Sequence, residues 1–545
     1  MRNLSVGLAV SLLITACGGG GGGSTNNSTN AVPASVNSTA QISVNNKEIL
    51  KGDNVTITWS STNANTCTAS GDWSGTKATT GSESVSASKE SNTFTITCGG
   101  TSASTTVNTF LYQTTVTTSD LPNYTSSVVT KDDLLTGMTR GVSSTTFIRG
   151  QDGKMRIFMF PSLFYNGEPM PAFELTETST NKFGSLKWHS NVRLGFGVAN
   201  TLINNNKEFV IVDQGLENTP DFKALPHGHV WIAKDSGSGF TFTQVSTNKA
   251  FYHNVAAADI TGDKKDDLLV VNMGVNDPNA NPNTLYAYHQ TDNGAFVQDK
   301  TFAPETLIKS LQDVGSGSVA AGDLDGDGTV EIVHANYKSY VTPNWGAFRI
   351  FQKNYLGNHK VVKTYQREGA FNYAGAYSTH LVDYDNDKDL DIIFALEGNM
   401  DPNDNKNFTM NAIEIYRNDG NFVFTRITES VLSKYIWDNV KDMYWRQLSI
   451  IDINNDGYLD IFLQHGGFGN RLNTTSIDLG KMVLRNDQGK GYTSLEGSQG
   501  LTVTFANFFK VPESFRIMDR QNNTTRIFGF DREGVPTIIE MRVGK

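Results

Sequence analysis

Short apolar runs recur along most of the chain, each bounded by polar turns. Examples are V-A-A-A from Val255 and L-L-V-V from Leu268, followed later by L-S-I-I from Leu448 and I-F-L-Q from Ile461. Runs of four or so residues that are rich in β-branched side chains are typical of β-strands. Each pair of runs flanks one polar stretch, so the pattern predicts a series of antiparallel hairpins joined by long turns.

The polar stretches repeat one acidic pattern. They read D-I-T-G-D-K-K-D-D from Asp259, D-L-D-G-D-G-T-V-E from Asp323, D-Y-D-N-D-K-D-L-D from Asp383 and D-I-N-N-D-G-Y-L-D from Asp452. Their starting positions lie 64, 60 and 69 residues apart, and a period of this size indicates a repeat architecture. They are not EF-hands, because position 12 holds no glutamate and the flanks read as strands.

Oxygen donors at positions 1, 3, 5 and 9 are what a hard cation such as calcium needs, and position 7 usually offers its backbone carbonyl. The predicted metal-ligating positions are Asp259, Thr261, Asp263, Lys265, Asp267, Asp323, Asp325, Asp327, Thr329, Glu331, Asp383, Asp385, Asp387, Asp389, Asp391, Asp452, Asn454, Asp456, Tyr458 and Asp460. The alternative is a set of acidic turns without metal, which the mutual repulsion of three or more carboxylates disfavours. The stretch from Asp259 is the weakest candidate, because it has Thr261 at position 3 and contains two lysines.

The succession of strand, D-x-D-x-D-G-x-x-D and strand resembles the FG-GAP and VCBS repeats of the integrin-α-type β-propeller. A second hairpin supports the resemblance, as in I-E-I-Y-R-N-D-G-N-F from Ile413, with related versions from Leu285 and from Val483. The resemblance covers roughly residues 110–545. It implies an all-β propeller fold that binds Ca²⁺ in three to four sites, with a structural role for the metal.

Three degenerate copies raise the number of repeats. The runs from Glu208, Arg156 and Arg526 align with the run from Asp267 and place position 1 at Asn200, Ile148 and Met518. Seven copies predict a seven-bladed propeller over residues 109–545. The last copy has room for only three strands. We therefore expect residues 110–118 to pair with the C-terminal strand and close the ring, which removes an open edge.

The first residues resemble a bacterial lipoprotein signal. An apolar stretch from Leu4 to Ala16 is too short to span a bilayer. It ends I-T-A-C, similar to a lipobox, which implies cleavage before Cys17 and acylation of that residue. An ordinary secretory signal with a stray cysteine is the alternative. Residues 1–17 are thus predicted to give a lipid anchor in the outer membrane, facing either the periplasm or the outside.

Between this signal and the propeller, residues 18–37 form a Gly/Ser/Asn-rich linker, and residues 38–108 alternate polar and apolar side chains. The alternation predicts strands around Ile42, Ile57 and Ile96. The segment resembles the small Ig-like β-sandwiches of bacterial surface proteins. With Cys17 used for lipid, Cys67 and Cys98 remain as an even pair, which we expect to form a disulfide in an exported protein.

Charge and motifs limit the range of functions. The chain is 18% charged with a net charge of −10 and has no basic stripe for nucleic acid. It lacks H-E-x-x-H, G-x-S-x-G and G-x-x-x-x-G-K-[ST], so the sequence assigns no catalytic residue. A site assembled from several blades would leave no such motif, and enzyme status stays open, with a non-catalytic role favoured.

Loops on a rigid scaffold commonly carry binding sites. The connections opposite the acidic stretches are long and aromatic, and seven residues are predicted to contribute to a ligand site there: Trp345, Tyr377, Trp437, Trp445, His253, His380 and Arg446. The leading interpretation is a surface or periplasmic binding or adhesion protein whose ligand is a glycan or a partner protein. The alternatives are a carbohydrate-active lyase or hydrolase with its site in the propeller funnel, and a scaffold subunit.

Overall fold

The computed structural model describes residues 37–119, 142–161, 164–165, 168–194, 198–213, 228–247, 250, 252–272, 285–302, 316–336, 347–353, 358–366, 375–397, 412–432, 445–465, 473–510, 515–530 and 536–544. These residues are almost entirely β-structure, which confirms the predicted all-β class. The described exceptions are one turn of α-helix, α3 (Thr428–Val431), and the 3-10 helix η3 (Leu479–Met482). Contacts divide the chain into two compact units: one contains Thr56–Val85 and Thr93–Thr106, and the other contains Val107–Lys545.

The N-terminal strands form two sheets. One has the order β1 (Thr39–Val44), β3 (Asn54–Thr62), β6 (Thr80–Ser86), and the other has the order β2 (Glu48–Leu50), β8 (Thr101–Phe110), β7 (Ser91–Cys98), β4 (Cys67–Gly71), β5 (Gly75–Lys77). The strands expected around Ile42, Ile57 and Ile96 are confirmed as β1, β3 and β7.

Three buried rings join these two sheets. Trp59 of β3 lies edge-on to Trp73, with 5.3 Å between ring centroids, and Trp73 lies edge-on to Phe94 of β7. Cys67 and Cys98 stand directly opposite each other on β4 and β7, and their sulfur atoms form the predicted disulfide.

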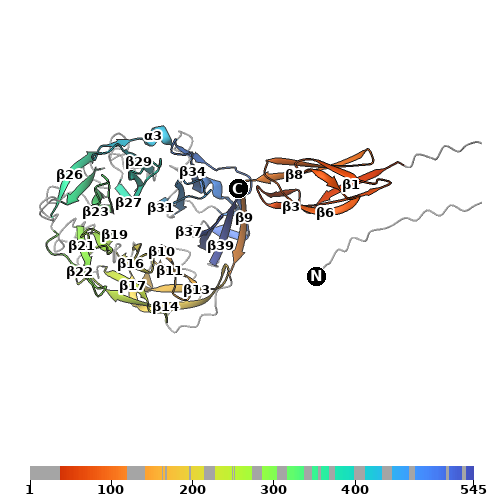
Figure 1. Cartoon of the computed structure of the whole chain (residues 1–545). Helices are drawn as coiled ribbons and strands as arrows, with labels where there is room; N and C mark the ends of the chain where they lie inside the picture. Colours follow the sequence, from red (N-terminus) through yellow and green to blue (C-terminus); the bar gives the residue numbers. More distant parts are fainter. Residues whose placement is uncertain are drawn as a thin grey trace, which may run out of the picture. The chain divides into compact units, whose positions relative to one another are not determined.

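The residues after β8 build a series of sheets around a common axis (Figure 1). Most sheets use four strands that follow one another in the sequence. In chain order the sheets are β10 (Val142–Arg149), β11 (Met155–Pro161), β13 (Glu168–Ser179) and β14 (Lys182–Leu194), with short β12 (Phe164–Tyr165) beside β13; β15 (Val198–Ile203), β16 (Glu208–Asp213), β17 (Val230–Asp235) and β18 (Phe240–Gln244); β19 (Tyr252–Ala258), β20 (Asp267–Asn272), β21 (Leu285–Gln290) and β22 (Phe296–Gln298); β23 (Ser316–Gly322), β24 (Glu331–Asn336), β25 (Ala347–Lys353) and β26 (His359–Gln366); β27 (Gly375–Val382), β28 (Asp391–Glu397), β29 (Ala412–Asn418) and β30 (Phe424–Arg426); β31 (Trp445–Ile451), β32 (Asp460–His465), β34 (Val483–Asn486) and β35 (Tyr492–Ser494); and β37 (Arg516–Gln521), β38 (Thr524–Phe530), β39 (Pro536–Val543) and β9 (Tyr112–Thr118). A further pair, β33 (Asn473–Asp478) and β36 (Thr502–Lys510), flanks β34 and β35 in the sequence.

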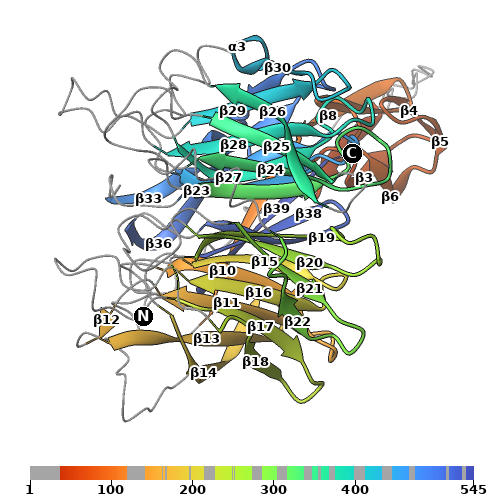
Figure 2. The ribbon, with the colours of Figure 1, turned by 90° about the vertical axis from the view of Figure 1, so that its left-hand side faces the viewer.

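The first strands of successive sheets lie next to one another. β10 contacts β15, which contacts β19, then β23, β27 and β31, while β32 contacts β37 and β37 returns to β10. This closed arrangement is a β-propeller. From the side, the strands run from one face of the ring to the other (Figure 2), so every hairpin turn lies at one of two faces.

The second strand of each sheet explains the continuous apolar runs of the sequence. All six residues of β20 are buried, and the same is true of β16 and β24. A strand in the middle of a sheet that is covered on both sides has no solvent face, so its apolar residues do not alternate with polar ones. For example, the ring centroid of Phe348 in β25 lies 5.0 Å from that of Phe394 in β28 and 4.9 Å from that of Tyr416 in β29.

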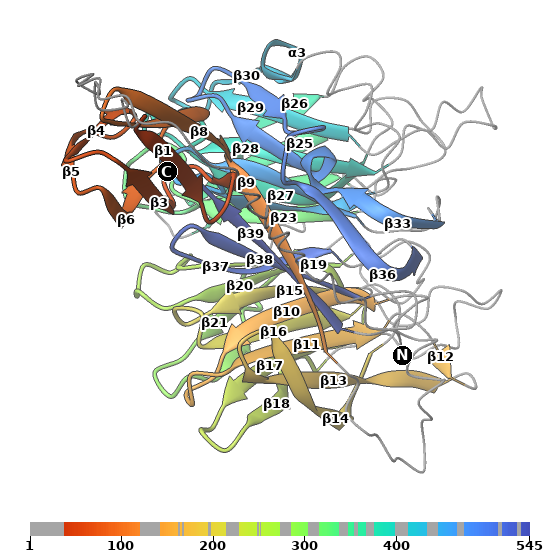
Figure 3. The same cartoon turned by 90° about the vertical axis from the view of Figure 1, so that its right-hand side faces the viewer.

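The predicted ring closure is confirmed. β9 pairs antiparallel with β39 in a register that sets Tyr112 opposite Val543 and Thr118 opposite Thr537. Figure 3 shows β9, from the start of the propeller chain, beside β39 from its end. The last sheet therefore reaches four strands only with this early segment, which covers the edge that β39 would otherwise expose.

The three degenerate copies differ from their prediction in loop geometry. Asn200, Ile148 and Met518, expected at position 1 of a loop, lie inside strands β15, β10 and β37. The strands continue through the region where the acidic copies form a loop, so their turns are shorter. Between β15 and β16 the turn is made by three asparagines in the left-handed conformation, Asn204, Asn205 and Asn206.

Candidate metal sites and central cavity

The four acidic stretches join the first and second strands of their sheets, at β19–β20, β23–β24, β27–β28 and β31–β32. In every one of them, positions 4 and 6 adopt a left-handed backbone. At the second loop these are Gly326 and Gly328, with φ of 75° and 84°, and at the fourth they are Asn455 and Gly457. Glycine and asparagine tolerate this conformation. The two reversals curl the loop so that its carboxylates turn inward.

The carboxylate at position 1 organises each loop from within. Asp323 accepts hydrogen bonds from the backbone N–H groups of Gly326 at 2.8 Å, Asp327 at 3.1 Å and Gly328 at 2.9 Å. Asp259, Asp383 and Asp452 accept equivalent bonds in their own loops. Position 1 therefore shapes the backbone, whether or not a cation is bound.

The carboxylate at position 9 is fully buried in all four loops. In the first, third and fourth loops it also ties the loop to the third strand of its sheet. Asp391 accepts from Tyr384 N at 3.0 Å and from Asn418 N at 2.8 Å. Asp460 makes the same pair of bonds with Ile453 N and Asn486 N. Burial raises the pKa of Asp391 and Asp460 to about 7. A nearby cation would favour the ionised form of these acids.

An asparagine at the end of the third strand links neighbouring sheets. The amide of Asn418 donates to Leu324 O of the preceding sheet's loop at 2.8 Å and to Leu390 O of its own loop at 3.2 Å. Asn486 bridges Tyr384 O and Leu459 O in the same way. Both are the asparagine of an R-N-D sequence. Sequence reasoning used this segment only as a repeat signature and missed its role in joining sheets.

Two loops gather three carboxylates into a group of the size that calcium needs. The groups are Asp323 with Asp325 and Glu331, and Asp383 with Asp385 and Asp391, each having ligand oxygens within 4.8 Å of one another. Oxygens on opposite sides of a calcium ion lie about 4.8 Å apart at a Ca–O distance of about 2.4 Å.

Asp385 of the third loop has a carboxylate oxygen that a cation would satisfy. Its Oδ1 is buried, with no hydrogen-bond partner among the described residues. Burial, followed by the charges of Asp387 and Asp383, raises its pKa. An orphaned carboxylate oxygen among like charges fits a site for a hard divalent cation. These residues would hold the ion, which would link the loop to the start of the second strand.

The position 5 carboxylates of these two loops bond locally instead. Asp327 accepts from Thr329 N at 2.7 Å and Asp387 accepts from Asp389 N at 3.0 Å. The sequence predicted them as ligands on equal terms with positions 1, 3 and 9, and that prediction stays untested. The position 7 residues contribute their N–H groups to these turns.

The first and fourth loops have different chemistry. In the first, Lys265 at position 7 lies 2.9 Å from Asp263 and 2.8 Å from Asp292, so an ammonium group stands among the acids. In the fourth, the amide of Asn454 donates to Asp456 at 2.9 Å. Within the described part of the chain, the three-acid groups occur in the second and third loops. These two loops are the better candidates for metal.

The residues predicted for the loop-face site are described only in part. Trp345 and Trp437 lie outside the described residues, and of Trp445 and Arg446 the structure describes the backbone, in β31. His253 and Tyr377 do meet: their rings lie 5.2 Å apart, and His253 Nδ1 bonds Gly317 O at 2.7 Å. Both stand near the starts of β19 and β27, on the side of the sheets away from the acidic loops. His380 lies farther along β27. The grouping of three or more of the seven stays a prediction.

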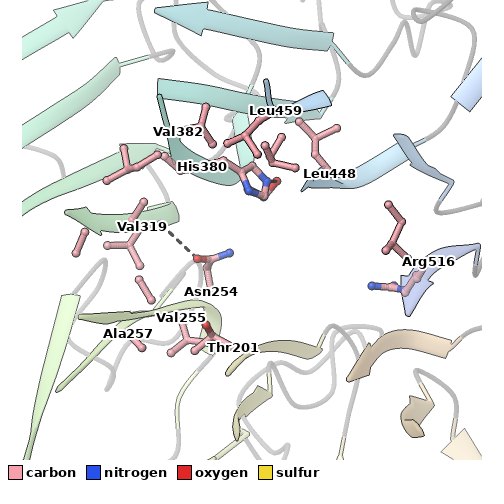
Figure 4. A pocket seen from close by; sticks show the side chains of 18 of the residues that line it. Thr201, Asn254, Val255, Ala257, Val319, His380, Val382, Leu448, Leu459 and Arg516 are labelled. Atoms are coloured by element: carbon pink, nitrogen blue, oxygen red, sulfur yellow. Dashed lines mark hydrogen bonds between the residues drawn. The ribbon is translucent and has the colours of Figure 1, made fainter. Parts of the chain in front are cut away.

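A cavity of about 680 Å³ lies between the first strands of the sheets, with walls from β10, β15, β19, β23, β27, β31 and β37. Asn254, His380 and Arg516 point into it from three of these strands (Figure 4). His380 Nε2 lies 3.1 Å from Ser378 Oγ, and burial lowers the pKa of His380 to about 4. Sequence reasoning placed His380 near the axis but missed Arg516, whose position depends on which strand closes the ring.

Comparison with known proteins agrees with the repeat. Residues 383–463 match the family described as FG-GAP-like repeat. The match covers the third and fourth acidic loops and the strands β28, β29, β30 and β31 between them. No curated protein matches the chain.

Among solved structures, the periplasmic gluconolactonase of Pseudomonas aeruginosa aligns with a TM-score of 0.38 and 11% identity, over 67% of this chain and 86% of the other. The Dos1 propeller aligns with a TM-score of 0.35 and 9% identity, over 74% of this chain and 93% of the other. Among the described residues, no helix is long and apolar enough to cross a membrane.

Proposed function

We propose that this chain is a calcium-stabilised binding protein of the bacterial cell envelope. One observation carries the proposal: the hairpin loops of an FG-GAP-type propeller hold two groups of three converging carboxylates, one of them within the matched repeat. Calcium at these groups would cross-link a loop to the start of the second strand. When the free calcium concentration is one hundred times the dissociation constant of a site, that site contributes about 2.7 kcal/mol to stability. The fourth loop is a third candidate site, and the first loop a weaker fourth.

The proposal includes a domain organisation. Residues 109–545 form a propeller of seven blades, the last completed by β9, and residues 38–108 form an Ig-like sandwich that the Cys67–Cys98 disulfide stabilises. Residues 18–37 are a flexible linker to a lipidated Cys17, which anchors the protein in the outer membrane. The sheet pairings support this division, and the sequence of the first 17 residues supports the anchor.

The proposed ligand is a glycan or a partner protein, bound at the loop face away from the acidic loops. The half-buried ring of Tyr377 supports this choice, because it lies beside the buried His253 at the strand ends that carry the long loops. Sugar rings stack on aromatic faces while their hydroxyls take hydrogen bonds.

A glycan array probed with the soluble chain from residue 38, in calcium, tests this function. Tyr377→Ala should lower binding to any glycan found by about tenfold, since removing an aromatic stacking partner and its buried area costs more than 1 kcal/mol. Tyr458→Ala is the matched control, because Tyr458 lies in the fourth acidic loop on the opposite face, and it should bind normally. Binding that Tyr458→Ala abolishes and Tyr377→Ala spares would place the ligand on the wrong face and refute the proposal.

A further inference from the structure

The third and fourth acidic loops are joined by a direct hydrogen bond. Asn386, at position 4 of the third loop, donates from its side-chain amide to the backbone oxygen of Gly457, at position 6 of the fourth loop, at 3.0 Å. Position 4 of the first and second loops is glycine, Gly262 and Gly326, which has no side chain that could make such a bond. The bond therefore distinguishes this pair of loops from the other neighbouring pairs.

On the side of the fourth loop, the bond acts on the peptide group that positions an acid. The oxygen of Gly457 belongs to the same planar peptide group as the N–H of Tyr458. That N–H donates to the Asp456 carboxylate at 2.9 Å. Holding the oxygen of Gly457 therefore orients the donor to Asp456, one of the predicted ligands. The fourth loop gains from such support, because it has Asn454 at position 3 in place of an acid.

On the side of the third loop, the bond depends on the turn that a cation would order. The acids Asp383, Asp385 and Asp391 converge there, and like charges in one group repel each other. Asp383 also accepts from the backbone N–H of Asp387 at 3.0 Å, the residue that follows Asn386. A cation that holds Asp383 therefore fixes the turn from which Asn386 reaches the neighbouring loop.

The other contacts between the third loop and the next sheet are close. Gly489, in the turn between β34 and β35, lies so near the third loop that a Cβ atom on it would stand 2.8 Å from the Cα of Asp385. The amide of Asn486 donates to Tyr384 O at 2.7 Å. Because no gap separates these segments, a change in the shape of the third loop is passed on to the sheet that carries the fourth loop.

We propose that the third and fourth loops bind calcium cooperatively, with Asn386 as the positioning residue that couples them. This inference rests on the proposed function, since it requires calcium in both loops. Calcium in the third loop offsets the repulsion among its acids and holds Asn386 against Gly457, so the fourth loop loses less conformational freedom when it binds calcium. By linkage, calcium in the fourth loop raises the affinity of the third loop by the same factor.

Isothermal titration of the purified, EDTA-treated chain with calcium chloride tests the coupling. Asp385→Asn disables the third site, and Asp456→Asn disables the fourth while it keeps an acceptor for the N–H of Tyr458. We expect Asp385→Asn to lower the calcium affinity of the fourth site by about fivefold, at the low end of typical couplings. Asp456→Asn should lower the affinity of the third site by the same factor.

Asn386→Gly locates the coupling in one side chain. It removes the amide, keeps every predicted ligand and gives position 4 the residue that the first and second loops carry. The coupling factor should then fall below about twofold. Asn455→Gly is the matched control, because Asn455 has the same left-handed backbone at position 4 of the fourth loop, and its side chain makes no hydrogen bond to the described residues of the third loop. This variant should keep the fivefold coupling.

The outcomes separate this inference from the proposed function. Calcium binding in which neither site responds to loss of the other would overturn the coupling and leave the calcium sites in place. A coupling factor that Asn386→Gly leaves unchanged, or that Asn455→Gly lowers equally, would overturn the role of Asn386. A titration that shows no calcium binding at all would overturn both the coupling and the proposed calcium-stabilised function.

Discussion

The acidic loops make a prediction in which one substitution has opposite effects with and without calcium. Asp385 stands in the third loop with a buried Oδ1 that has no described partner, and burial together with Asp387 and Asp383 raises its pKa. A raised pKa in an acid means that the folded state disfavours its ionised form, so at pH 7 the ionised Asp385 destabilises the metal-free protein. Asp385→Asn removes that charge at nearly constant shape. In EDTA the variant should melt at or above the temperature of the unsubstituted protein.

In excess calcium the unsubstituted protein should melt at a higher temperature than Asp385→Asn. Each calcium site adds about 2.7 kcal/mol to the free energy of unfolding when the free calcium concentration is one hundred times its dissociation constant. Unfolding entropy is about 2.1 cal/mol/K per residue, so a propeller of about 430 residues gains roughly 3 °C in Tm for each site. The second and third loops together should then raise Tm by roughly 6 °C. Asp385→Asn should lose about half of this gain because it disables one of the two sites.

The matched control is Asp263→Asn in the first loop, where Lys265 already supplies a positive charge to the acids. It should leave the calcium-dependent gain within about 1 °C of the unsubstituted protein. Differential scanning calorimetry in EDTA and in excess calcium measures all three proteins. A Tm that calcium leaves unchanged, or a loss in Asp385→Asn that is equally large in EDTA, would refute the reasoning.

Three further predictions follow from contacts within the propeller. Asn418→Ala should destabilise the propeller by about 2 kcal/mol, because it leaves Leu324 O and Leu390 O without their donor. Arg417→Ala, next to it, should cost less than about 0.5 kcal/mol. Urea unfolding compares the two variants, and equal losses of stability would contradict the role of Asn418 in joining neighbouring sheets. Burial, followed by the charge of Arg349, lowers the pKa of His334 to about 3, below its unfolded value, so stability that is present above the unfolded pKa is lost as pH falls. The unsubstituted protein should therefore lose roughly 2 kcal/mol relative to His334→Gln between pH 7 and pH 5, and parallel pH profiles of unfolding would disprove this. A chain that begins at residue 107 keeps β9 and should be folded and monomeric by gel filtration, whereas one that begins at residue 119 exposes the edge of β39 and should aggregate; similar behaviour of the two would refute closure by β9.

Several features could be predicted from the sequence because they depend on neighbours along the chain. The acidic spacing and the apolar runs predict hairpins, since the strand period and the turn are local properties. The D-x-D-x-D-G pattern predicts where carboxylates converge, because left-handed positions such as Gly328 and Gly457 curl the loop within a few residues. Closure by residues 110–118 followed from counting strands, since an incomplete last copy requires a partner from elsewhere.

The rest was decided by contacts between segments far apart in the sequence. Asn418 bonds Leu324, 94 residues earlier, and only the packing of one sheet against the next brings them together. Lys265 reaches Asp292, in the hairpin turn between β21 and β22, so the chemistry of the first loop could not be settled from its own nine residues. Arg516 and Thr145 face one cavity because the ring closes and brings β37 against β10. Local spacing determines which groups each loop presents, whereas ring closure determines which side chains line the central cavity.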